Sequence, residues 1–262
     1  MDPTIIDLIH PHTGRIESIE PAPGFGASST GVVRAEEGRF FVKATPQGSR
    51  DLEAARREAA VNPFIRPVSP AVLWKAEDKD WFVLGIDVVE GRSADFSPGS
   101  SDLPTVIDTL NRVSALPLPD VARGWTETRW DRFVTDAEKE LLRGDALTHT
   151  DIHGRNFLIG AEDAWLVDWE WPTRATPAAM PTCLAVQLVS SGHSPESAES
   201  WVSKMVAWER SSAESLGAVA RANARLNRWF AELRAGEKWL GAMAEAAESW
   251  ADHRAGSSPA ER

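Results

Sequence analysis

The stretch from Leu147 to Trp171 reads LTHTDIHGRNFLIGAEDAWLVDWEW. Two short apolar runs, FLI and WLV, flank the polar turn GAEDA, and this pattern predicts a β-hairpin. Asp151 and Asn156 precede the hairpin, and Asp168 follows it. These polar groups could belong to solvated turns. Alternatively, the carboxylates and the amide could gather around a metal ion and a transferable group.

The composition is that of an ordinary soluble globular protein. The chain has 262 residues, of which 42% are hydrophobic, so it can bury one large core or two smaller ones. Its formal charge of −11 argues against a nucleic-acid partner, because nucleic-acid binders normally present a basic face. Cys183 is the only cysteine, which excludes an intramolecular disulfide and indicates a reducing compartment.

Nothing in the sequence indicates export or a membrane partner. The first residues, MDPTIIDLIHPHTG, lack a basic segment followed by an apolar core, so we expect no signal peptide. No apolar run approaches the roughly 20 residues that cross a bilayer. We therefore expect a cytoplasmic protein, as a monomer or a weak homodimer.

The pattern along the chain changes near residue 91. Before it, VVRAEEGRFFVKA and AVLWKAEDKDWFVLGIDVV predict two β-hairpins, and SRDLEAARREAAV predicts a helix that begins at Ser49 or Asp51 and ends before Pro63. After a connector rich in Gly, Ser and Pro, the pattern becomes helical, with helices at 103–116 and 130–142.

We therefore predict an α+β fold with two lobes. Residues 1–91 would form a small β-rich N-terminal lobe with one helix, and residues 92–254 a larger, mainly helical C-terminal lobe. Residues 255–262 read as a flexible tail. Two lobes joined by a hinge suit a ligand that is held in the cleft between them.

A Gly-rich stretch in the N-terminal part is a candidate phosphate-binding loop. Gly24 and Gly26 allow a close backbone approach to a ligand, and the hydroxyls of Ser28 and Ser29 can donate to phosphate oxygens. A loop of this composition between two strands is more commonly a simple turn.

Lys43 ends the β-like run RFFVK. A lysine on a strand usually faces solvent. The alternative is an ammonium that lies under the Gly-rich loop and binds phosphates. Either Glu53 or Glu58, on the following predicted helix, could pair with it. A glycine loop, a strand lysine and a helix glutamate recur in this order in ATP-phosphate sites.

The polar groups of the opening stretch suit phosphoryl transfer. Asp151 can orient a hydroxyl and accept its proton, while the Asn156 amide oxygen and the Asp168 carboxylate are hard ligands for Mg²⁺. His149 would support the loop through hydrogen bonds, and His153 would either do the same or pack. A zinc site at these histidines is disfavoured, because the only cysteine is distant in the sequence and the loop supplies oxygen ligands.

The chain resembles the aminoglycoside phosphotransferase family, the small-molecule branch of the protein-kinase-like fold. The segments that carry the resemblance, spread over residues 24–170, are GFGASSTGVV, FFVK, RREAAV, GIDVVEGR, LTHTDIHGRNFLI and AWLVDWE. The catalytic-loop and metal-strand segments are specific, whereas the glycine loop is loose.

The resemblance implies a role for each matching residue. Asp151 corresponds to the catalytic base, Asn156 and Asp168 to the magnesium ligands, Lys43 to the phosphate-binding lysine and Glu58 to its partner. Further residues matching the nucleotide site are Gly24, Gly26, Ser28, Ser29 and, as backbone contacts to adenine beside the hinge glycine Gly91, Asp87 and Val89.

The implied activity is transfer of the γ-phosphate of ATP, with Mg²⁺, to a hydroxyl of a small molecule such as an antibiotic or a metabolite. The alternative is a catalytically silent nucleotide-binding protein on the same fold. Silent relatives commonly lack at least one of the four reacting residues, all of which are present here.

Two residues depart from the family pattern. Thr150 stands where members usually have a glycine between the loop histidine and aspartate, and Thr182 stands where many have an aspartate at the start of the next helix. Thr182 could still cap that helix. Neither change removes a reacting group.

The sequence of the C-terminal helices says less about the acceptor. Trp239 and Trp250 share a helical face and favour core packing over ligand stacking. Arg221, Arg225 and Arg228 favour a solvated, salt-bridged face. Charges nearly balance from residue 193 onward, so no strongly anionic pocket for a polycationic aminoglycoside is predicted, although Glu170 and Asp131 could contribute acidity.

The segment after Asp168 distinguishes a small acceptor from a protein acceptor. It reads WEWPTRATPAAMPTCLAV, without the Phe-Gly and Ala-Pro-Glu that bound the activation segment of protein kinases. Such a short, proline-broken run offers little platform for a peptide strand. We therefore expect the acceptor to be a small molecule.

Overall fold

The structure is a computed structural model that describes residues 1–22 and 28–256. The chain divides into two compact units: Met1–Gly91 together with Val167–Trp171 form unit 1, and Arg92–Leu166 together with Pro172–Arg262 form unit 2. The predicted mixture of helices and strands is confirmed. The sequence placed one boundary at residue 91, whereas in the structure the short segment around Asp168 returns to unit 1.

Unit 1 is built on one antiparallel sheet in the order β1-β2-β3-β5-β4. Its strands are β1 (Ile16–Pro21), β2 (Ser29–Ala35), β3 (Gly38–Pro46), β4 (Val72–Glu77) and β5 (Trp81–Asp87). Both predicted hairpins are present, β2–β3 and β4–β5. Gly38 closes the first with a φ of 133°, a conformation that a residue with a Cβ rarely adopts. The Asp78 carboxylate closes the second by accepting from the backbone of Asp80 and Trp81.

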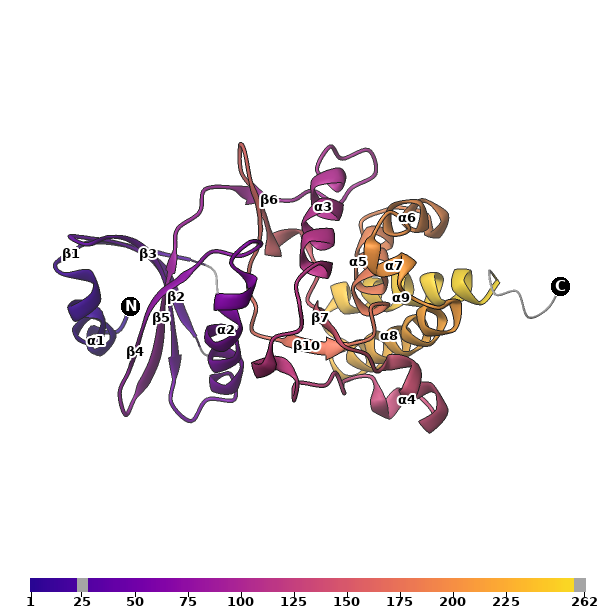
Figure 1. Cartoon of the computed structure of the whole chain (residues 1–262), viewed down its shortest axis with the longest axis horizontal. Helices are drawn as coiled ribbons and strands as arrows, with labels where there is room; N and C mark the ends of the chain where they lie inside the picture. Colours follow the sequence, from indigo (N-terminus) through magenta and orange to yellow (C-terminus); the bar gives the residue numbers. More distant parts are fainter. Residues whose placement is uncertain (23–27, 257–262) are drawn as a thin grey trace. The chain divides into compact units, whose positions relative to one another are not determined.

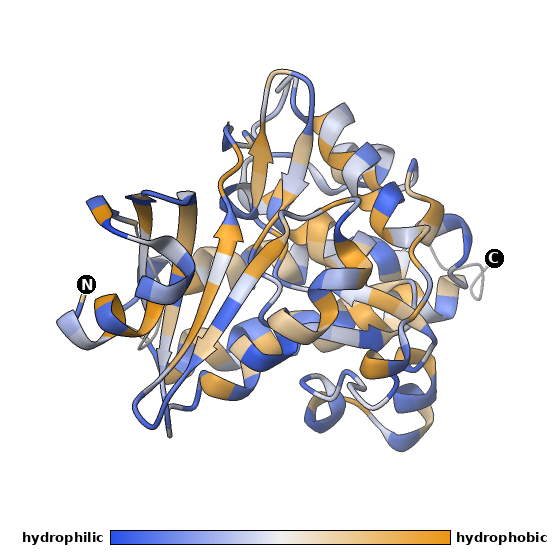
Figure 2. Cartoon of the chain, turned by 60° about the vertical axis from the view of Figure 1, so that its left-hand side comes forward, coloured by the Kyte–Doolittle hydropathy of each residue, from blue (hydrophilic) through white to orange (hydrophobic). Residues whose placement is uncertain are grey.

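Two helices cover the two faces of this sheet, as Figure 1 shows: α1 (Pro3–Thr13) and α2 (Leu52–Ile65). Successive residues of a strand point to opposite faces, and Figure 2 shows the resulting mixture of apolar and polar residues along the strands. Val83 packs with the core beneath α1, whereas its neighbours Phe82 and Leu84 pack with Ala55 of α2. Apolar burial therefore holds one helix on each face.

Helix α1 corrects the expectation of a single helix in this part of the chain. Its signals are present in the sequence: Asp2 caps the first turn by accepting from the Thr4 N–H, and Ile5 and Ile9 lie four residues apart and are fully buried. Helix α2 also runs further than predicted, because Pro63 lies within its last turn instead of beyond its end.

Unit 2 contains two small sheets and most of the helices. Its strands are β6 (Arg92–Ser93), β7 (Ala146–His149), β8 (Phe157–Ile159), β9 (Ala164–Leu166) and β10 (Pro172–Ala175). Its helices are α3 (Leu103–Ser114), α4 (Asp136–Leu142), α5 (Ala179–Ser190), α6 (Pro195–Val202), α7 (Val206–Glu209), α8 (Ala213–Leu233) and α9 (Lys238–Gly256), with 3₁₀ turns η1 (Asp120–Ala122), η2 (Asp131–Phe133) and η3 (Gly154–Asn156).

The predicted hairpin of the opening stretch is β8–β9, and β6 joins it as a third strand. Strand β7, which leads into the catalytic loop, pairs with β10. Helix α3 matches its prediction. The helix predicted at 130–142 is shorter, because Thr135 forms a capping box with Glu138 and starts α4 there.

Thr182 does not cap α5. The helix begins earlier, at Ala179, so Thr182 lies inside it and is fully buried. The expectation of a capping role was therefore wrong. Across the described ranges 1–22 and 28–256, no helix combines the length and apolar character needed to cross a membrane.

Candidate active site

In unit 1, Lys43 is surrounded by three carboxylates. Its Nζ lies 2.9 Å from Oε2 of Glu58, 2.7 Å from Oδ1 of Asp168 and 2.8 Å from Oε1 of Glu170. Lys43 is only 8% exposed, so the solvent-facing alternative is wrong. Strand alternation explains its direction: Val42 and Ala44 pack in the core beneath α1, so Lys43 projects from the opposite face, which α2 covers.

The structure also decides between the two candidate glutamates. Glu58 is buried and pairs with Lys43, while Glu53 forms an exposed ion pair with Arg57 on the same helix. The second carboxylate oxygen of Glu58, Oε1, accepts from the backbone N–H of Trp169 at 3.2 Å. Glu58 therefore ties both Lys43 and the segment that carries Asp168 to α2.

Asp168 has an unusual backbone conformation. Its φ is 65°, and it is the only residue other than glycine with a positive φ in the described part of the chain. Aspartate visits this left-handed region more readily than most residues, but the conformation is still sparsely populated and such residues concentrate at functional sites. The conformation lets Asp168 and Glu170, two residues apart, both reach Lys43.

Burial and charge act against each other on Lys43. Burial alone would lower the pKa of the ammonium, but the neighbouring carboxylates of Glu58, Asp168 and Glu170 raise it well above its usual value. Burial raises the pKa of Glu170, and the attraction of Lys43 offsets this only in part. The ammonium therefore stays charged throughout the physiological range.

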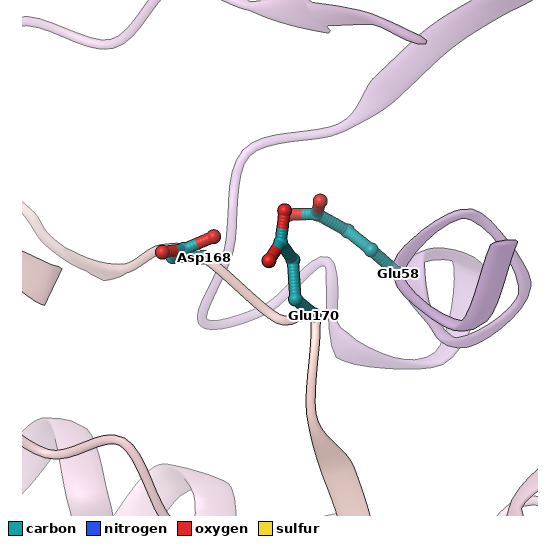
Figure 3. Close-up of side chains that lie close together, drawn as sticks. All are labelled: Glu58, Asp168 and Glu170. Carbon is teal, nitrogen blue, oxygen red and sulfur yellow. The ribbon is translucent and has the colours of Figure 1, made fainter. Parts of the chain in front are cut away.

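The three carboxylates could also hold a metal ion. One oxygen from each of Glu58, Asp168 and Glu170 lies within 4.8 Å of the others, and Figure 3 shows the Glu58 and Glu170 carboxylates turned toward each other. Carboxylate oxygens are the donors that Mg²⁺ prefers, so the donor set fits magnesium. With three carboxylates around one ammonium, a further cation would balance the site.

The catalytic-loop residues lie in unit 2. Asn156, in η3, is buried, and its Nδ2 donates to the backbone oxygen of Asp151 at 2.8 Å and to Oδ2 of Asp151 at 3.2 Å. Both bonds use the amide nitrogen, so the amide oxygen is the atom with which Asn156 would bind magnesium. The short loop between them, with Asn156 five positions after Asp151, thus brings these two side chains together.

Two neighbouring histidines lower the pKa of Asp151. Burial by itself would raise the Asp151 pKa, but His153, His149 and the Asn156 amide lower it to about 2. His153 Nε2 lies 3.6 Å from Asp151 Oδ2. Asp151 is therefore a carboxylate at any physiological pH and can accept a hydrogen bond from a hydroxyl.

Thr150, which departs from the family pattern just before Asp151, is held by Arg129, whose ion-pair partner Glu127 is buried. An Arg129 nitrogen donates to the Thr150 hydroxyl, and Arg129 also binds Glu127, with Nη2 2.6 Å from Oε2. Glu127 is 2% exposed and in addition accepts from the Thr173 hydroxyl. Hydrogen bonds to charged groups are among the stronger ones, so this network restrains the residue that precedes Asp151.

The remaining nucleotide-site residues have the following positions. Gly24 and Gly26 lie outside the described residues. Ser29 begins β2, and the Ser28 hydroxyl lies 2.9 Å from the Thr45 hydroxyl. Asp87 ends β5, where its backbone N–H donates to the Ala71 carbonyl. The backbone group left for a contact with an adenine base is therefore the Asp87 carbonyl oxygen. Val89 follows in a segment without regular structure.

Sequence reasoning missed two site residues. Glu170 was considered only as a contributor to an acceptor pocket, yet it pairs with Lys43. The sequence could have indicated this role, because an acidic residue two positions after Asp168 can bind the same cation as Asp168. Arg129 carried no such signal, because it lies 21 positions before Thr150 outside any motif. Asp131 pairs with Arg143.

No family model and no curated protein sequence matches this chain. Solved structures do match it. A spectinomycin phosphotransferase, APH(9)-Ia, in complex with ADP and spectinomycin superimposes with a TM-score of 0.63 at 12% identity, covering 96% of this chain and 94% of that one.

Two further structures superimpose nearly as well. An aminoglycoside phosphotransferase, APH(4)-Ia, in a ternary complex with AMP-PNP and hygromycin B has a TM-score of 0.62 at 10% identity, covering 94% of this chain and 98% of that one. A microcompartment-associated aminopropanol kinase has a TM-score of 0.59 at 14% identity and 97% coverage of both chains. The chain thus has the protein-kinase-like fold of the aminoglycoside phosphotransferases, which confirms the fold that the sequence resemblance predicts.

Proposed function

We propose that this protein is an ATP-dependent phosphotransferase that moves the γ-phosphate of ATP to a hydroxyl group of a small molecule. The observation that carries the proposal is the bonding of Lys43 to both Glu58 and Asp168 within unit 1. A lysine fixed in this way would present a permanent positive charge to phosphate oxygens, and Asp168 would bind the metal ion that accompanies them.

Asp168 would hold magnesium, with Glu170 as a further carboxylate near it. The family resemblance implies the Asn156 amide oxygen of unit 2 as a further ligand. The ion would supply charge neutralisation of the phosphates. Support comes from donor chemistry, because all three side chains offer hard oxygen atoms. The AMP-PNP and ADP complexes of the similar structures support a nucleotide as the phosphate donor.

Asp151 would act on the acceptor. Its carboxylate accepts the hydroxyl proton while the acceptor oxygen forms the new bond to phosphorus, and the bond to the leaving oxygen breaks so that ADP departs with that electron pair. The low pKa of Asp151 makes it a weak base, so its main contribution would be to orient the hydroxyl. Arg129 would help by restraining Thr150.

A small acceptor is supported by the short segment after the metal-binding residues. Strand β10 begins at Pro172 and pairs with β7, and α5 begins at Ala179. Few residues therefore lie between Trp171 and α5, which leaves little chain for docking a peptide. Spectinomycin and hygromycin B, bound by the similar structures, are small molecules with hydroxyl groups.

The test is magnesium-dependent ADP release with a library of hydroxylated antibiotics and metabolites, run beside generic protein substrates and labelled ATP. We expect release above the acceptor-free rate with at least one small molecule, and its loss in Asp151→Asn. Intact Mg·ATP binding without transfer to any acceptor would favour the silent nucleotide-binding alternative. Transfer to protein alone would contradict a small acceptor.

A further inference from the structure

Unit 2 contains a pocket of about 390 Å³. Its walls come from three parts of the chain: the catalytic-loop residues His153, Gly154 and Arg155, the segment from Ser93 to Phe96, and residues of α5 and α9 that include Gln187, Trp239 and Met243. Its volume falls within the range of about 300–1,000 Å³ that is typical of small-molecule sites.

The pocket lies next to Asp151. His153 lines it, and the Nε2 atom of the same ring is 3.6 Å from Asp151 Oδ2. A molecule in the pocket would therefore contact the residue that lies beside the Asp151 carboxylate.

Two of the walls are held in place by main-chain contacts. The Ala94 N–H donates to the carbonyl of Gly154 at 3.0 Å, and a Cβ on Gly154 would lie only 2.4 Å from the Ala94 oxygen. His193, which is buried, contacts the Phe96 carbonyl through Nε2 at 3.1 Å. The catalytic loop and the adjoining segment thus form a wall whose shape exists before any ligand binds.

Trp239 corrects the expectation that it packs in the core together with Trp250. Trp250 is fully buried, but Trp239 is 60% exposed in the first turn of α9. Its Nε1 donates to Glu237 Oε2 at 2.9 Å, which orients the indole. A large aromatic ring that is both exposed and oriented offers a flat apolar surface to a ligand.

The lining carries little net charge. Among the described residues that line the pocket, Asp95 is the only carboxylate and Arg155 the only residue with a permanent positive charge. The Asp95 carboxylate already accepts from the backbone and hydroxyl of Ser97. A molecule with several positive charges would need more carboxylates than this lining supplies.

We propose that this pocket binds the acceptor and selects a small alcohol of low net charge that carries a flat apolar ring, which stacks on Trp239. This inference rests on the proposed phosphotransferase function. The proposed mode of recognition differs from that of polycationic antibiotics, because the pocket would select its ligand through one aromatic face and a balanced pair of charges. The hydroxyl that receives phosphate would lie on the His153 side, toward Asp151.

The test measures binding by saturation-transfer NMR on the full chain, without requiring turnover. The matched probes are phenyl glucoside and methyl glucoside, which share their hydroxyls but differ in the ring; pyridoxine and spectinomycin complete the set. The variants are Trp239→Ala and, as a control, Leu233→Ala, which removes another side chain that is 61% exposed and lies on α8, outside the pocket lining.

We expect phenyl glucoside or pyridoxine to bind about tenfold more tightly than methyl glucoside, and this preference to fall at least about fivefold in Trp239→Ala but not in Leu233→Ala. Spectinomycin should bind more weakly than the ring alcohols. The inference would be overturned if neither ring alcohol bound. It would also be overturned if the ring alcohols bound equally well to wild type and Trp239→Ala, or if spectinomycin bound more tightly than the ring alcohols.

The same samples separate this inference from the proposed function. Trp239-dependent binding of a ring alcohol, with no magnesium-dependent ADP release from any acceptor, would defeat the phosphotransferase proposal while leaving the ligand class of the pocket intact. Asp151-dependent ADP release with an acceptor that binds equally well to wild type and Trp239→Ala would support the phosphotransferase proposal and overturn the ligand class inferred for the pocket.

Discussion

The Lys43 ammonium lies 2.7 Å from Oδ1 of Asp168, although the two residues are 125 positions apart in the chain. Glu58 binds the same ammonium from α2 and also accepts from the Trp169 N–H, so the strand, the helix and the Asp168 segment meet at one nitrogen. Their meeting point combines permanent positive charge with a cluster of carboxylates, which is the combination that a magnesium–nucleotide complex needs.

Lys43→Met should remove the ion pairs of Lys43 with Glu58, Asp168 and Glu170. Removing the cation leaves the buried Glu58 carboxylate without its partner, and loss of one member of a buried ion pair costs about 3 kcal/mol or more of folding stability. Mg·ATP affinity should fall as well. Urea denaturation and calorimetric titration measure the two effects. Arg39→Met, which breaks an exposed pair with Glu90, is the control and should change stability by less than about 1 kcal/mol. Equal stability of the two variants would contradict the importance of the buried cluster.

Asp151→Asn should separate binding from transfer. The amide keeps the shape of the carboxylate but lacks its charge, so it can neither accept the proton nor orient the hydroxyl through a charge-assisted hydrogen bond. Turnover should therefore fall by about 10²- to 10⁴-fold. Mg·ATP affinity should stay within about twofold, because Asp151 would contact the acceptor hydroxyl. ADP release and calorimetry provide the two readouts, and near-normal turnover would show that Asp151 is not the base.

Asp168→Ala should weaken Mg·ATP binding itself, because it removes a metal ligand and one partner of Lys43. Glu170→Gln tests the adjacent carboxylate, which also contacts Lys43. If both hold the ion, the magnesium concentration for half-maximal activity should rise in each variant, and more in Asp168→Ala. Unchanged Mg·ATP affinity in Asp168→Ala would argue against its role as a ligand.

Thr150→Val should reveal what the Arg129 contact contributes. Valine keeps the shape of threonine but cannot accept the hydrogen bond from Arg129, so the residue before Asp151 loses a restraint. We expect kcat to fall by about three- to tenfold, equivalent to roughly 1 kcal/mol, with unchanged Mg·ATP affinity. Thr150→Ser retains the hydroxyl and should restore activity. If Thr150→Val were as active as the wild type, the network would have only a structural role.

The Asp151 pKa predicts a pH dependence of stability. Its folded pKa is about 2, below its usual value of 3.8, so ionised Asp151 stabilises the folded state above about pH 4, and this contribution is lost as the pH falls toward 2. The stability difference between wild type and Asp151→Asn should therefore change as the pH falls below about 4. Thermal unfolding of both proteins across this range gives the difference directly. A difference that stays unchanged down to pH 2 would contradict this stabilising role of the ionised carboxylate.

Local patterns in the sequence were sufficient for many elements. Short β-rich or apolar runs joined by polar turns predicted both hairpins of unit 1 and the β8–β9 hairpin, and helical spacing predicted α3. These signals depend on neighbouring residues alone, so they can be interpreted without knowing the fold. The five-residue spacing of Asp151 and Asn156 was informative for the same reason, because a short loop restricts both side chains.

Only the tertiary structure decided the features that depend on residues far apart in the chain. Glu53 and Glu58 lie on the same helix, yet only Glu58 faces Lys43, because strand alternation and the packing of α2 set which face of the helix meets the sheet. Trp239 and Trp250 share a helix, and one is exposed while the other is buried, because only part of α9 is covered by other elements. Burial is a property of the assembled molecule, so no local period encodes it. The sequence by itself therefore determined the elements and the reacting groups, and packing across large sequence separations determined which groups meet.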